Sequence, residues 1–472
     1  MKESLFRKVV LLIGLLLTYL CGPWLQGACG QELAPPRTLV AQTYNSGFDL
    51  AHDTYNAISA ASDGKIYYVL SSESIDVGGQ MYCYDPGTDK IRHLADLTEA
   101  CGEKGLKKIP QGKCHCNFYE RDGKLYFSTH AGFYEIVDGM EMMVRNPPKG
   151  YKLYPGGHLL SYDMATEKFE NLGIAPYGEA FLTMTMDTER GQIYAITWPK
   201  GYFIHYDLGT KKMKNLGTFS AEGEAGAPGK TYRTLCRSMV VDPRDGTVYF
   251  TTSTGDIFSY NANSPALRIV EGVDMRKDYF GSYDPASAGH MGYNWRRVVW
   301  YHGLPARENT AKMAVPLAYG VHGNSGYLFR FDPRKPDLEV VERITSEPSQ
   351  RSGMFDQFSY GYLGFELGPN GHTLYYLTGG PIYIDGKRLK GKDRIAMGAA
   401  KGLENLHLIT YDIPTGKYID HGTVFYKDGQ RPLYVNSIAV GKDGAVYTLA
   451  RITENGHTRA DLIKIPDPFK KR

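Results

Sequence analysis

A short motif recurs six times along this chain and constrains its fold more than any other feature. Each copy consists of a turn that ends in Gly, followed by a strand carrying an apolar residue next to Tyr. The copies are DGKIYYVL (63–70), DGKLYFST (122–129), RGQIYAIT (190–197), DGTVYFTT (245–252), NGHTLYYL (370–377) and DGAVYTLA (443–450). A two-residue turn with Gly in second position is a strong signal for a β-hairpin. The motif therefore predicts repeated antiparallel hairpins along the whole chain.

A second element follows most copies and extends each hairpin into a larger unit. It is a strand, a Tyr-Asp-type corner and the start of another strand. It reads MYCYDPGTDKI (81–91), LLSYDMATEKF (159–169), FIHYDLGTKKM (203–213), IFSYNANSPAL (257–267), YLFRFDPRKPDL (327–338) and LITYDIPTGKY (408–418). Because the corners recur in nearly every unit, we interpret them as architecture. Each unit is then a four-stranded meander, which must stack on its neighbours to bury its faces.

Radial repetition of such units predicts an all-β chain folded as a β-propeller. An irregular fifth unit, with VVWYHG (298–303) and YGVHGNSG (319–326) as its strands, brings the predicted number of blades to seven. No fourth strand follows LIKIP (462–466), so we expect RTLVAQTY (37–44) to supply it and close the ring. A β-sandwich followed by another domain would not explain one motif that recurs to the end.

The N-terminus has the pattern of a secretory signal. Lys2, Arg7 and Lys8 precede the apolar run VVLLIGLLLTYL (9–20), which is too short to span a bilayer as an ordinary helix. We predict a signal peptide over residues 1–30, a single propeller domain over 31–472, and a secreted or periplasmic protein without a stable membrane span. Lipoprotein anchoring through Cys29 is the less favoured alternative, because Gln26 and Gly27 fit that signal badly.

Five cysteines remain after residue 30, at positions 83, 101, 114, 116 and 236. An odd number cannot form a complete disulfide set, so we expect mostly free, buried thiols.

Charge and motifs exclude several function classes. The net charge of +3 includes +2 from Lys2, Glu3, Arg7 and Lys8, so only +1 remains on the mature chain and nothing indicates nucleic-acid binding. The chain has no GxSxG, Walker, HExxH or dinucleotide-binding motif, so we expect no nucleotide or redox cofactor. No paired carboxylates stand out at the predicted rim, which weakens a glycoside hydrolase interpretation.

The stretch KCHCNFYERDGKLYFSTHAG (113–132) places two histidines on either side of an Asp-Gly turn. If Asp122 and Gly123 form a two-residue turn, the numbers of paired residues sum to 245, which makes His115 and His130 direct cross-strand partners. Cys114 and Cys116 would point to the opposite face, because successive strand residues alternate. This argues against a Cys-His-Cys metal site.

The same arithmetic predicts polar residues at one level around the rim of the propeller channel. It pairs Asn56 with Ser71, Thr183 with Trp198, Ser238 with Ser253, and Asn436 with Arg451. The irregular fifth unit and the sixth unit would contribute residues near Asn294, Arg296, His322, Tyr360 and Tyr362, and TYRTLCRSM (231–239) would bring Tyr232, Arg233 and Arg237 to the fourth blade. An arginine at this rim suits a carboxylate or sulfate. It is also compatible with a structural role on loop carbonyls.

Three interpretations of the histidine pair remain open. The two imidazoles could be catalytic or substrate-binding, they could bind a divalent metal together with His322 or a carboxylate, or they could form a structural hydrogen-bonded pair. Two imidazoles this close cannot easily both carry charge, so at least one should be neutral near pH 7 and available as a base.

With this rim set, the sequence resembles the secreted propeller polysaccharide lyases, of which the ulvan lyases are the nearest type. The resemblance implies β-elimination of a uronate-containing polysaccharide by His115 and His130, with Arg237 or Arg233 binding the carboxylate and Tyr232 or another rim tyrosine assisting. From their places at the predicted rim we expect substrate-binding roles for Asn56, Trp198, Arg233, Asn294, Arg296, His322, Tyr360, Asn436 and Arg451. The triad of metal histidines expected for oligogalacturonate lyase-type propellers is not evident.

Two other function classes compete with the lyase. A propeller with a polar, aromatic channel mouth could bind a glycan or peptide without turnover. A lactonase-like hydrolase would need a metal held by acidic ligands, and the predicted rim offers few. As partners we expect an anionic polysaccharide or oligosaccharide, no nucleic acid, and a monomeric chain. A divalent cation is compatible with the sequence.

Overall fold

The computed structural model describes residues 38–470, except 54, 138–139, 281, 287–290, 304–314, 323–324, 353–363, 382, 385–386 and 389–403. The predicted signal peptide, Cys29, Tyr360 and Tyr362 lie outside the described residues. Thr38–Arg472 form one compact unit. The predicted domain boundary at residue 31 stays a prediction.

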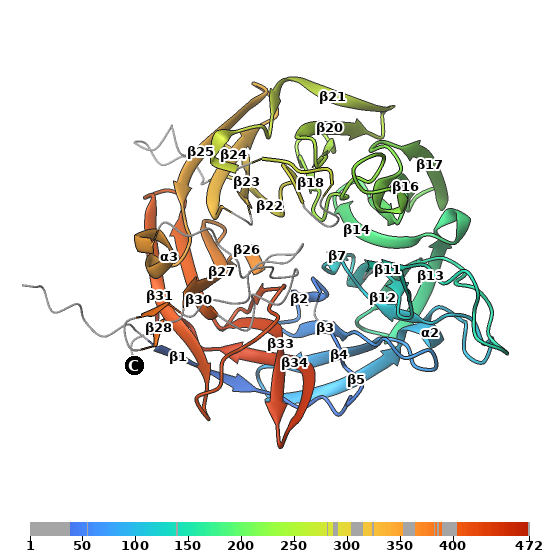
Figure 1. The fold of residues 1–472 in the computed structure, drawn as a ribbon, viewed down its shortest axis with the longest axis horizontal. Helices are drawn as coiled ribbons and strands as arrows, with labels where there is room; N and C mark the ends of the chain where they lie inside the picture. Colours follow the sequence, from blue (N-terminus) through green and yellow to red (C-terminus); the bar gives the residue numbers. More distant parts are fainter. Residues whose placement is uncertain are drawn as a thin grey trace, which may run out of the picture. The chain divides into compact units, whose positions relative to one another are not determined.

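The described chain is built from seven four-stranded antiparallel blades, as the repeats predicted (Figure 1). The strands of each blade are given from the innermost outward. Blade 1 consists of β2 (Ile58–Ala60), β3 (Ile66–Leu70), β4 (Gln80–Asp85) and β5 (Lys90–Asp96), and blade 2 of β7 (Tyr119–Arg121), β8 (Lys124–Ser128), β12 (His158–Asp163) and β13 (Lys168–Ile174). Blade 3 consists of β14 (Ala180–Asp187), β15 (Gln192–Trp198), β16 (Tyr202–Asp207) and β17 (Lys212–Thr218), and blade 4 of β18 (Val240–Val241), β19 (Val248–Thr251), β20 (Asp256–Asn261) and β21 (Ser264–Asp274). Blade 5 consists of β22 (Arg297–Tyr301), β23 (Leu317–His322), β24 (Tyr327–Asp332) and β25 (Asp337–Arg343), and blade 6 of β26 (Gly364–Leu367), β27 (Thr373–Pro381), β30 (Glu404–Asp412) and β31 (Lys417–Tyr426). Blade 7 consists of β32 (Ala439–Val440), β33 (Val446–Glu454), β34 (His457–Ile465) and β1 (Thr38–Thr43).

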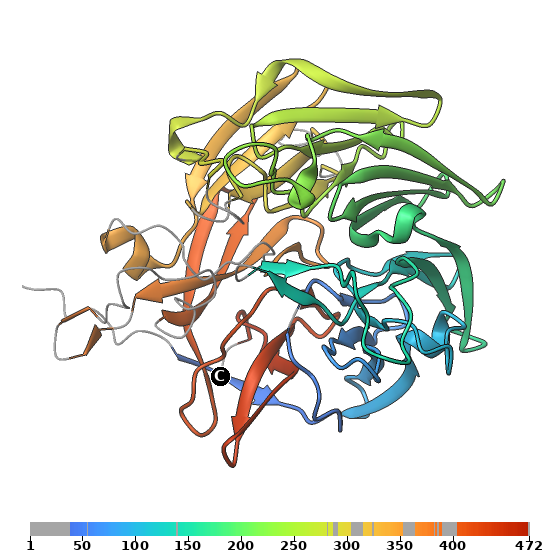
Figure 2. The same ribbon diagram turned by 45° about the vertical axis from the view of Figure 1, so that its right-hand side comes forward.

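The N-terminal strand β1 closes the last blade, as expected. It pairs antiparallel with β34 through Gln42 and Lys464, and parallel with β31 of blade 6 through Leu39 and Val424. Blades 6 and 7 therefore form one continuous eight-stranded sheet. Figures 1 and 2 both show the blue strand β1 lying beside the red strand β34. Joining strands from the two ends of the chain removes the exposed sheet edges that an open ring would have.

Successive blades contact one another through their innermost strands. Strand β14 contacts β18, and the contacts continue through β22, β26 and β32 to β2. Blade 2 completes the circle, because β14 also contacts β8, and the Phe118 amide donates to Ser59 Oγ of blade 1 at 3.0 Å. The fold is a seven-bladed β-propeller.

The hydrophobic core is distributed between the blades. It consists of five buried clusters, each of which includes side chains from neighbouring blades. One cluster joins blades 7 and 1 through Tyr68, Tyr84 and Tyr447, all at least 99% buried. The tyrosines of the repeated motif therefore fill the space between sheets. Two of them also bond to the turn: Tyr67 donates to Asp63, and Tyr447 donates to Asp443, at 2.9 and 2.8 Å.

The Tyr-Asp corners are turns capped by their own carboxylates. Asp85, Asp163, Asp207 and Asp412 each accept hydrogen bonds from backbone amides two or three residues further along. Such Asx turns replace backbone pairing at a tight bend. The architectural interpretation of these corners is consistent with this geometry.

The predicted two-residue hairpin occurs in blade 2, where Arg121 pairs with Lys124. It does not occur in blades 1, 3, 4 and 7, whose first hairpin loops are four to six residues long. The short turn requires positive φ at both central residues. Asp122 and Gly123 have φ of 52° and 72°, whereas Gly64 has positive φ and Asp63 does not. The Asp63 side chain instead accepts from the Lys65 amide, which widens the turn.

The predicted pairings outside blade 2 are consequently wrong. Asn56 does not face Ser71, because the blade 1 ladder pairs Ile58 with Tyr68. Thr183 pairs with Ile196, and Trp198 pairs with Ala180. In blade 4 the ladder pairs Val240 with Tyr249, and Arg451 of blade 7 bridges Leu433, so neither Ser238–Ser253 nor Asn436–Arg451 forms.

The remaining elements are short. They are α2 (Leu97–Ala100), α3 (Glu347–Ser352), the 3₁₀ turns η1 (Pro176–Gly178), η2 (Gly223–Ala225) and η3 (Asp278–Phe280), and the small strands β6 (Gln111–Lys113), β9 (His130–Ala131), β10 (Glu135–Val137), β11 (Met140–Met142), β28 (Tyr383–Ile384) and β29 (Lys387–Arg388). Within the part of the chain that the structure describes, no helix has the length and apolar character to cross a membrane.

Candidate functional site

His115 and His130 are neighbours, but not through the predicted ladder. His130 begins β9, where its backbone pairs with Lys113 of β6. The blade 2 ladder pairs Tyr119 with Tyr126, so the register moves by two residues before the histidines are reached. The irregular segment 114–118 between β6 and β7 absorbs this shift and brings the His115 ring onto the His130 ring. The predicted proximity is confirmed, and the predicted direct pairing is wrong.

The two imidazoles form the centre of a stack of rings. Their centroids are 4.1 Å apart, with an interplanar angle of 14°. Tyr55 stacks on His115 at 4.0 Å, and Trp198 lies 5.3 Å from His130. These rings come from blades 1, 2 and 3. We call Tyr55, His115, His130 and Trp198 the aromatic stack.

The hydrogen bonds of His130 determine its tautomer. Its Nδ1 lies 3.3 Å from the Ala131 carbonyl and 2.9 Å from the Tyr134 hydroxyl. The Tyr134 hydroxyl itself donates to the Ala131 carbonyl, so its oxygen accepts from Nδ1–H. The proton is therefore on Nδ1, and the lone pair of Nε2 is available. This Nε2 is buried and has no hydrogen-bond partner among the residues that the structure describes.

Burial and neighbouring charges keep both imidazoles neutral. His130 is 2% exposed, and burial together with the charges of Lys113 and Arg237 lowers its pKa to about 3. Burial, His130 and the same two cations also hold the pKa of His115 well below its usual value. The pair therefore combines neutral bases with nearby positive charge, an arrangement that only a desolvated site maintains.

Lys113 supplies the nearest of these charges from a fully buried position. Its Nζ donates to Glu73 at 2.7 Å and to the Tyr55 hydroxyl at 3.0 Å. Burial would lower its pKa, but Tyr134, Glu141 and Glu73 raise it, so the amine stays charged.

The backbone of β6 and β9 allows this burial because Gly112 and Gly132 face each other. A β-carbon on Gly112 would lie 2.2 Å from Gly132 Cα. The two strands could not approach this closely with any other residue at position 112.

A row of alternating charges leads from Lys113 toward blade 7. Glu73 lies 3.5 Å from His52, His52 lies 3.4 Å from Asp53, and Asp53 lies 2.5 Å from Arg451. The guanidinium of Arg451 also covers the Tyr434 ring at 4.2 Å. The outer members are accessible: the side chains of His52, Glu73 and Arg451 are 52%, 30% and 33% exposed. We call His52, Asp53, Glu73 and Arg451 the charged mouth.

His52, Asp53 and Glu73 could geometrically surround a metal ion. Their carboxylates, however, already neutralise the protein's own cations, since Asp53 pairs with Arg451 and Glu73 with Lys113. Burial alone would raise the pKa of Asp53. Its hydrogen bond to His52 and the charges of Lys113 and Arg451 outweigh this effect, so the net pKa is lowered and Asp53 remains ionised. The negative charges of Asp53 and Glu73 are therefore balanced by Arg451 and Lys113 without an added ion.

Arg237 approaches the aromatic stack from blade 4. Its Nη1 lies 2.7 Å from Glu224 Oε1, and the other oxygen of Glu224 accepts from Trp198 Nε1 at 2.9 Å. Glu224, in η2, thus ties the arginine to the stack. Arg237 is thus linked through Glu224 to Trp198, whose ring lies 5.3 Å from that of His130, and its predicted role at the site stays a prediction.

Several predicted substrate-binding residues have structural environments instead. Arg233 donates to the carbonyls of Lys230 and Tyr232. Asn294 is fully buried and donates to the Thr234 carbonyl at 2.9 Å. His322 is fully buried, bonds to Ser325 at 2.9 Å and stacks on Phe280. For these three side chains the geometry favours loop and core stabilisation over contact with a ligand.

The other predicted residues are placed but not assigned a role. Asn56, Tyr232, Arg296 and Asn436 are all buried, with exposed fractions of at most 5%. Their parts in a site stay predictions. Trp198 and Arg451 belong to the aromatic stack and the charged mouth.

Sequence reasoning missed the residues that surround the pair, namely Asp53, Tyr55, Glu73, Lys113, Tyr134 and Glu224. The expectation of a rim with few acidic groups is corrected by Asp53, Glu73 and Glu224. Two signals were present in the sequence. Lys113 precedes His115 by two positions, and Tyr134 follows His130 by four. The expected thiols are confirmed: all five cysteines are free and buried, and Cys114 and Cys116 face the core beside Ser128.

No family model and no curated protein matches the chain. Solved structures resemble it at low identity. A chain of the mitotic checkpoint complex aligns with a TM-score of 0.48 and 10% identity, covering 92% of this chain and 94% of that one. An oligogalacturonate lyase in complex with manganese aligns at 0.45 and 11%, covering 92% and 98%. The β-propeller domain of Cps50 (Swd1) from Myceliophteria thermophila aligns at 0.44 and 8%, covering 91% and 99%. At these values the likeness carries no argument about activity.

Proposed function

We propose that this chain is a secreted lyase that cleaves a uronate-containing polysaccharide by β-elimination at the aromatic stack. The observation that carries the proposal is His130, a neutral imidazole with an available Nε2 lone pair, whose pKa is lowered by Lys113 and Arg237, cations that also pair with Glu73 and Glu224. A uronate needs the same combination. Positive charge neutralises its carboxylate and acidifies the C5 proton, and a neutral base removes that proton.

In the proposed reaction, His130 Nε2 takes the proton from C5. The electron pair of that C–H bond forms the C4=C5 double bond, and the C4–O4 bond breaks. The departing O4 receives a proton and becomes a hydroxyl on one fragment, while the other fragment ends in an unsaturated uronate. A carboxylate beside His130 would also raise the pKa of His130, which improves it as a base.

Tyr55 is suited to protonate O4. Burial holds its pKa well above the usual value, so the phenol carries its proton. Lys113 donates to the Tyr55 oxygen at 3.0 Å and would stabilise the phenolate left after proton transfer. Arg237 pairs with Glu224, so we assign the stabilisation of the Tyr55 phenolate to Lys113.

The competing functions are less well supported by the site. A lactonase-like hydrolase would require the carboxylates of the charged mouth for a metal, yet they pair with Arg451 and Lys113. A purely binding propeller would not need His130 held in one tautomer by Tyr134. Export through the N-terminal leader remains part of the proposal.

The decisive test is the ultraviolet absorbance of the conjugated double bond, followed while the purified protein is incubated with a panel of uronate-containing polysaccharides. We expect a rise with at least one member. His130→Asn should reduce its rate about 100-fold or more while polysaccharide binding is retained. The matched control is His457→Asn, an exposed histidine at the start of β34, outside both the aromatic stack and the channel.

The other outcomes are also informative. Equal rates for the wild type and His130→Asn would contradict the role of this imidazole. Binding without any rise in absorbance across the panel would identify a binding propeller.

A further inference from the structure

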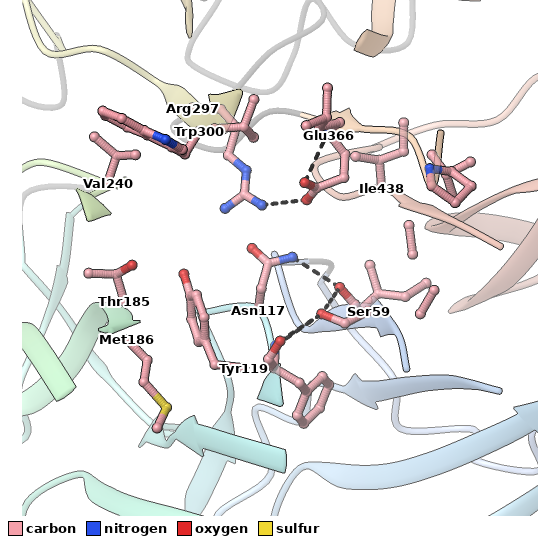
Figure 3. Close-up of a pocket in the computed structure, with 18 of the residues that line it drawn as sticks. Ser59, Asn117, Tyr119, Thr185, Met186, Val240, Arg297, Trp300, Glu366 and Ile438 are labelled. Atoms are coloured by element: carbon pink, nitrogen blue, oxygen red, sulfur yellow. Dashed lines mark hydrogen bonds and ion pairs between the residues drawn. The ribbon is translucent and has the colours of Figure 1, made fainter. Parts of the chain in front are cut away.

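A separate cavity lies in the central channel, enclosed by the innermost strands of the blades (Figure 3). Its volume is about 600 Å³, and its lining comes from all seven blades. No member of the aromatic stack or the charged mouth lines it. Asn117, two residues after His115, belongs to its wall. The cavity is thus adjacent to the proposed catalytic site and chemically independent of it.

Asn117 presents an unsatisfied acceptor to this cavity. Its Nδ2 donates to the Ile58 carbonyl at 3.0 Å, which determines the orientation of the amide. The residue is only 9% exposed, and its buried Oδ1 has no hydrogen-bond partner among the described residues. Figure 3 shows this oxygen directed into the space between Tyr119 and Arg297. Leaving a buried carbonyl oxygen without a partner is energetically unfavourable, because the oxygen loses its hydration on burial.

Trp300 presents the complementary group, an unsatisfied donor. Its indole Nε1 is buried and likewise without a partner in the described part of the chain. One face of its ring lies under Arg244, at 5.1 Å. Buried polar atoms are normally satisfied, so an acceptor and a donor left open in one cavity indicate a ligand with both kinds of group.

Two further polar groups converge on the same space. Tyr119 donates its proton to the Met184 carbonyl at 3.0 Å, which leaves its oxygen as an acceptor. Arg297 pairs with Glu366 at 2.7 Å and donates to the Phe365 carbonyl through Nε. Glu366 neutralises Arg297, and the other cation of the lining, Lys442, donates to the Ser62 carbonyl. An anionic ligand would either displace the Glu366 carboxylate from Arg297 or be repelled by it.

We propose that this cavity binds a neutral sugar ring or polyol. Hydroxyl groups can donate to Asn117 and Tyr119 and accept from Trp300, which no purely apolar ligand can do. The C–H faces of a sugar suit the apolar part of the lining, which includes Val240 and Ile438. The volume is about twenty times the share of one liquid water molecule, so it accommodates a ligand of this size.

Calorimetric titration of the full-length protein with D-galactose, D-glucose, D-xylose and glycerol tests this site, and D-galacturonate serves as the anionic comparator. We expect saturable binding of at least one neutral probe and weaker binding of galacturonate. Trp300→Phe keeps the ring and removes only the N–H, so affinity should fall about 3- to 10-fold. Asn117→Leu should abolish binding, with thermal unfolding used to confirm that it folds.

His130→Asn separates this proposal from the proposed lyase. It lies outside the cavity and should bind the neutral probe as the wild type does, even if turnover is lost. The proposal is overturned if no neutral probe gives saturable heat, if galacturonate binds more tightly than galactose, or if Trp300→Phe binds with unchanged affinity.

Discussion

Replacing Lys113 with Met tests whether a buried cation organises the candidate site. The wild-type ammonium group is fully buried and donates to Glu73 at 2.7 Å and to Tyr55 at 3.0 Å. It also lies 4.5 Å from the centre of the Tyr134 ring. Met has a similar length and no charge, so it fills the space while removing all three interactions. The Tyr55 hydroxyl then loses a partner in a buried place.

The magnitude follows from these contacts. Each hydrogen bond to a charged group contributes about 1.5–3 kcal/mol, and the contact with the ring about 1 kcal/mol. The loss is smaller than their combination, because Glu73 is 30% exposed and regains hydration when Lys113 is absent. We expect the free energy of unfolding to fall by about 3–5 kcal/mol, as for other broken buried ion pairs.

Urea unfolding measures this difference, and Lys104→Met is the matched control. Lys104 pairs with Glu99, but its side chain is 73% exposed, so its loss should cost about 0–1 kcal/mol. The pKa of His130, followed by NMR, should rise in Lys113→Met because a charge that lowers it has been removed. A loss of stability below about 1 kcal/mol, or an unchanged His130 pKa, would refute the reasoning.

Two further predictions concern stability. The pKa of His130 is lowered to about 3 from 6.5, so its contribution is fully present above pH 6.5 and is lost as the pH falls from there toward 3. Urea unfolding at a series of pH values should show stability falling more steeply for the wild type than for His130→Asn, by about 1.4 kcal/mol per pH unit; parallel curves would contradict this. Gly112→Ala would place a β-carbon 2.2 Å from Gly132 Cα and 2.4 Å from the Ser72 carbonyl oxygen. We expect a loss of about 3 kcal/mol or more in thermal unfolding, and a near-neutral effect would show that β6 and β9 can separate.

The repeated motif was sufficient to predict the propeller, because its information is local. Alternation places Tyr67 and Tyr447 toward the neighbouring blade, and each donates to an Asp four residues earlier. Strand pairing within a blade joins segments close in sequence, which pattern alone can identify. The closure by β1 was predictable for a different reason, since the last unit lacked a strand.

The turn geometry was predictable only in blade 2. Within the repeated motif, Asp-Gly occurs at 63–64, 122–123, 245–246 and 443–444, but of these four aspartates only Asp122 adopts positive φ. Elsewhere the carboxylate bonds to a backbone amide two residues on, as Asp63 and Asp443 do, and the loop lengthens. Local competition between side-chain and backbone hydrogen bonds changes the register without changing the sequence signal. The predicted rim pairs of blades 1, 3, 4 and 7 failed for this reason.

The sequence by itself determined the seven-bladed ring, the strand that closes it, the free buried thiols and the proximity of His115 and His130. Only the tertiary structure decided what surrounds that pair. Asp53 and Arg451 are 398 residues apart in the chain, and Lys113 and Glu73 are 40 apart, yet these contacts determine which groups are charged. Strand patterns are set by neighbours in sequence, whereas the protonation of a buried group depends on every charge within a few ångströms, whichever blade carries it.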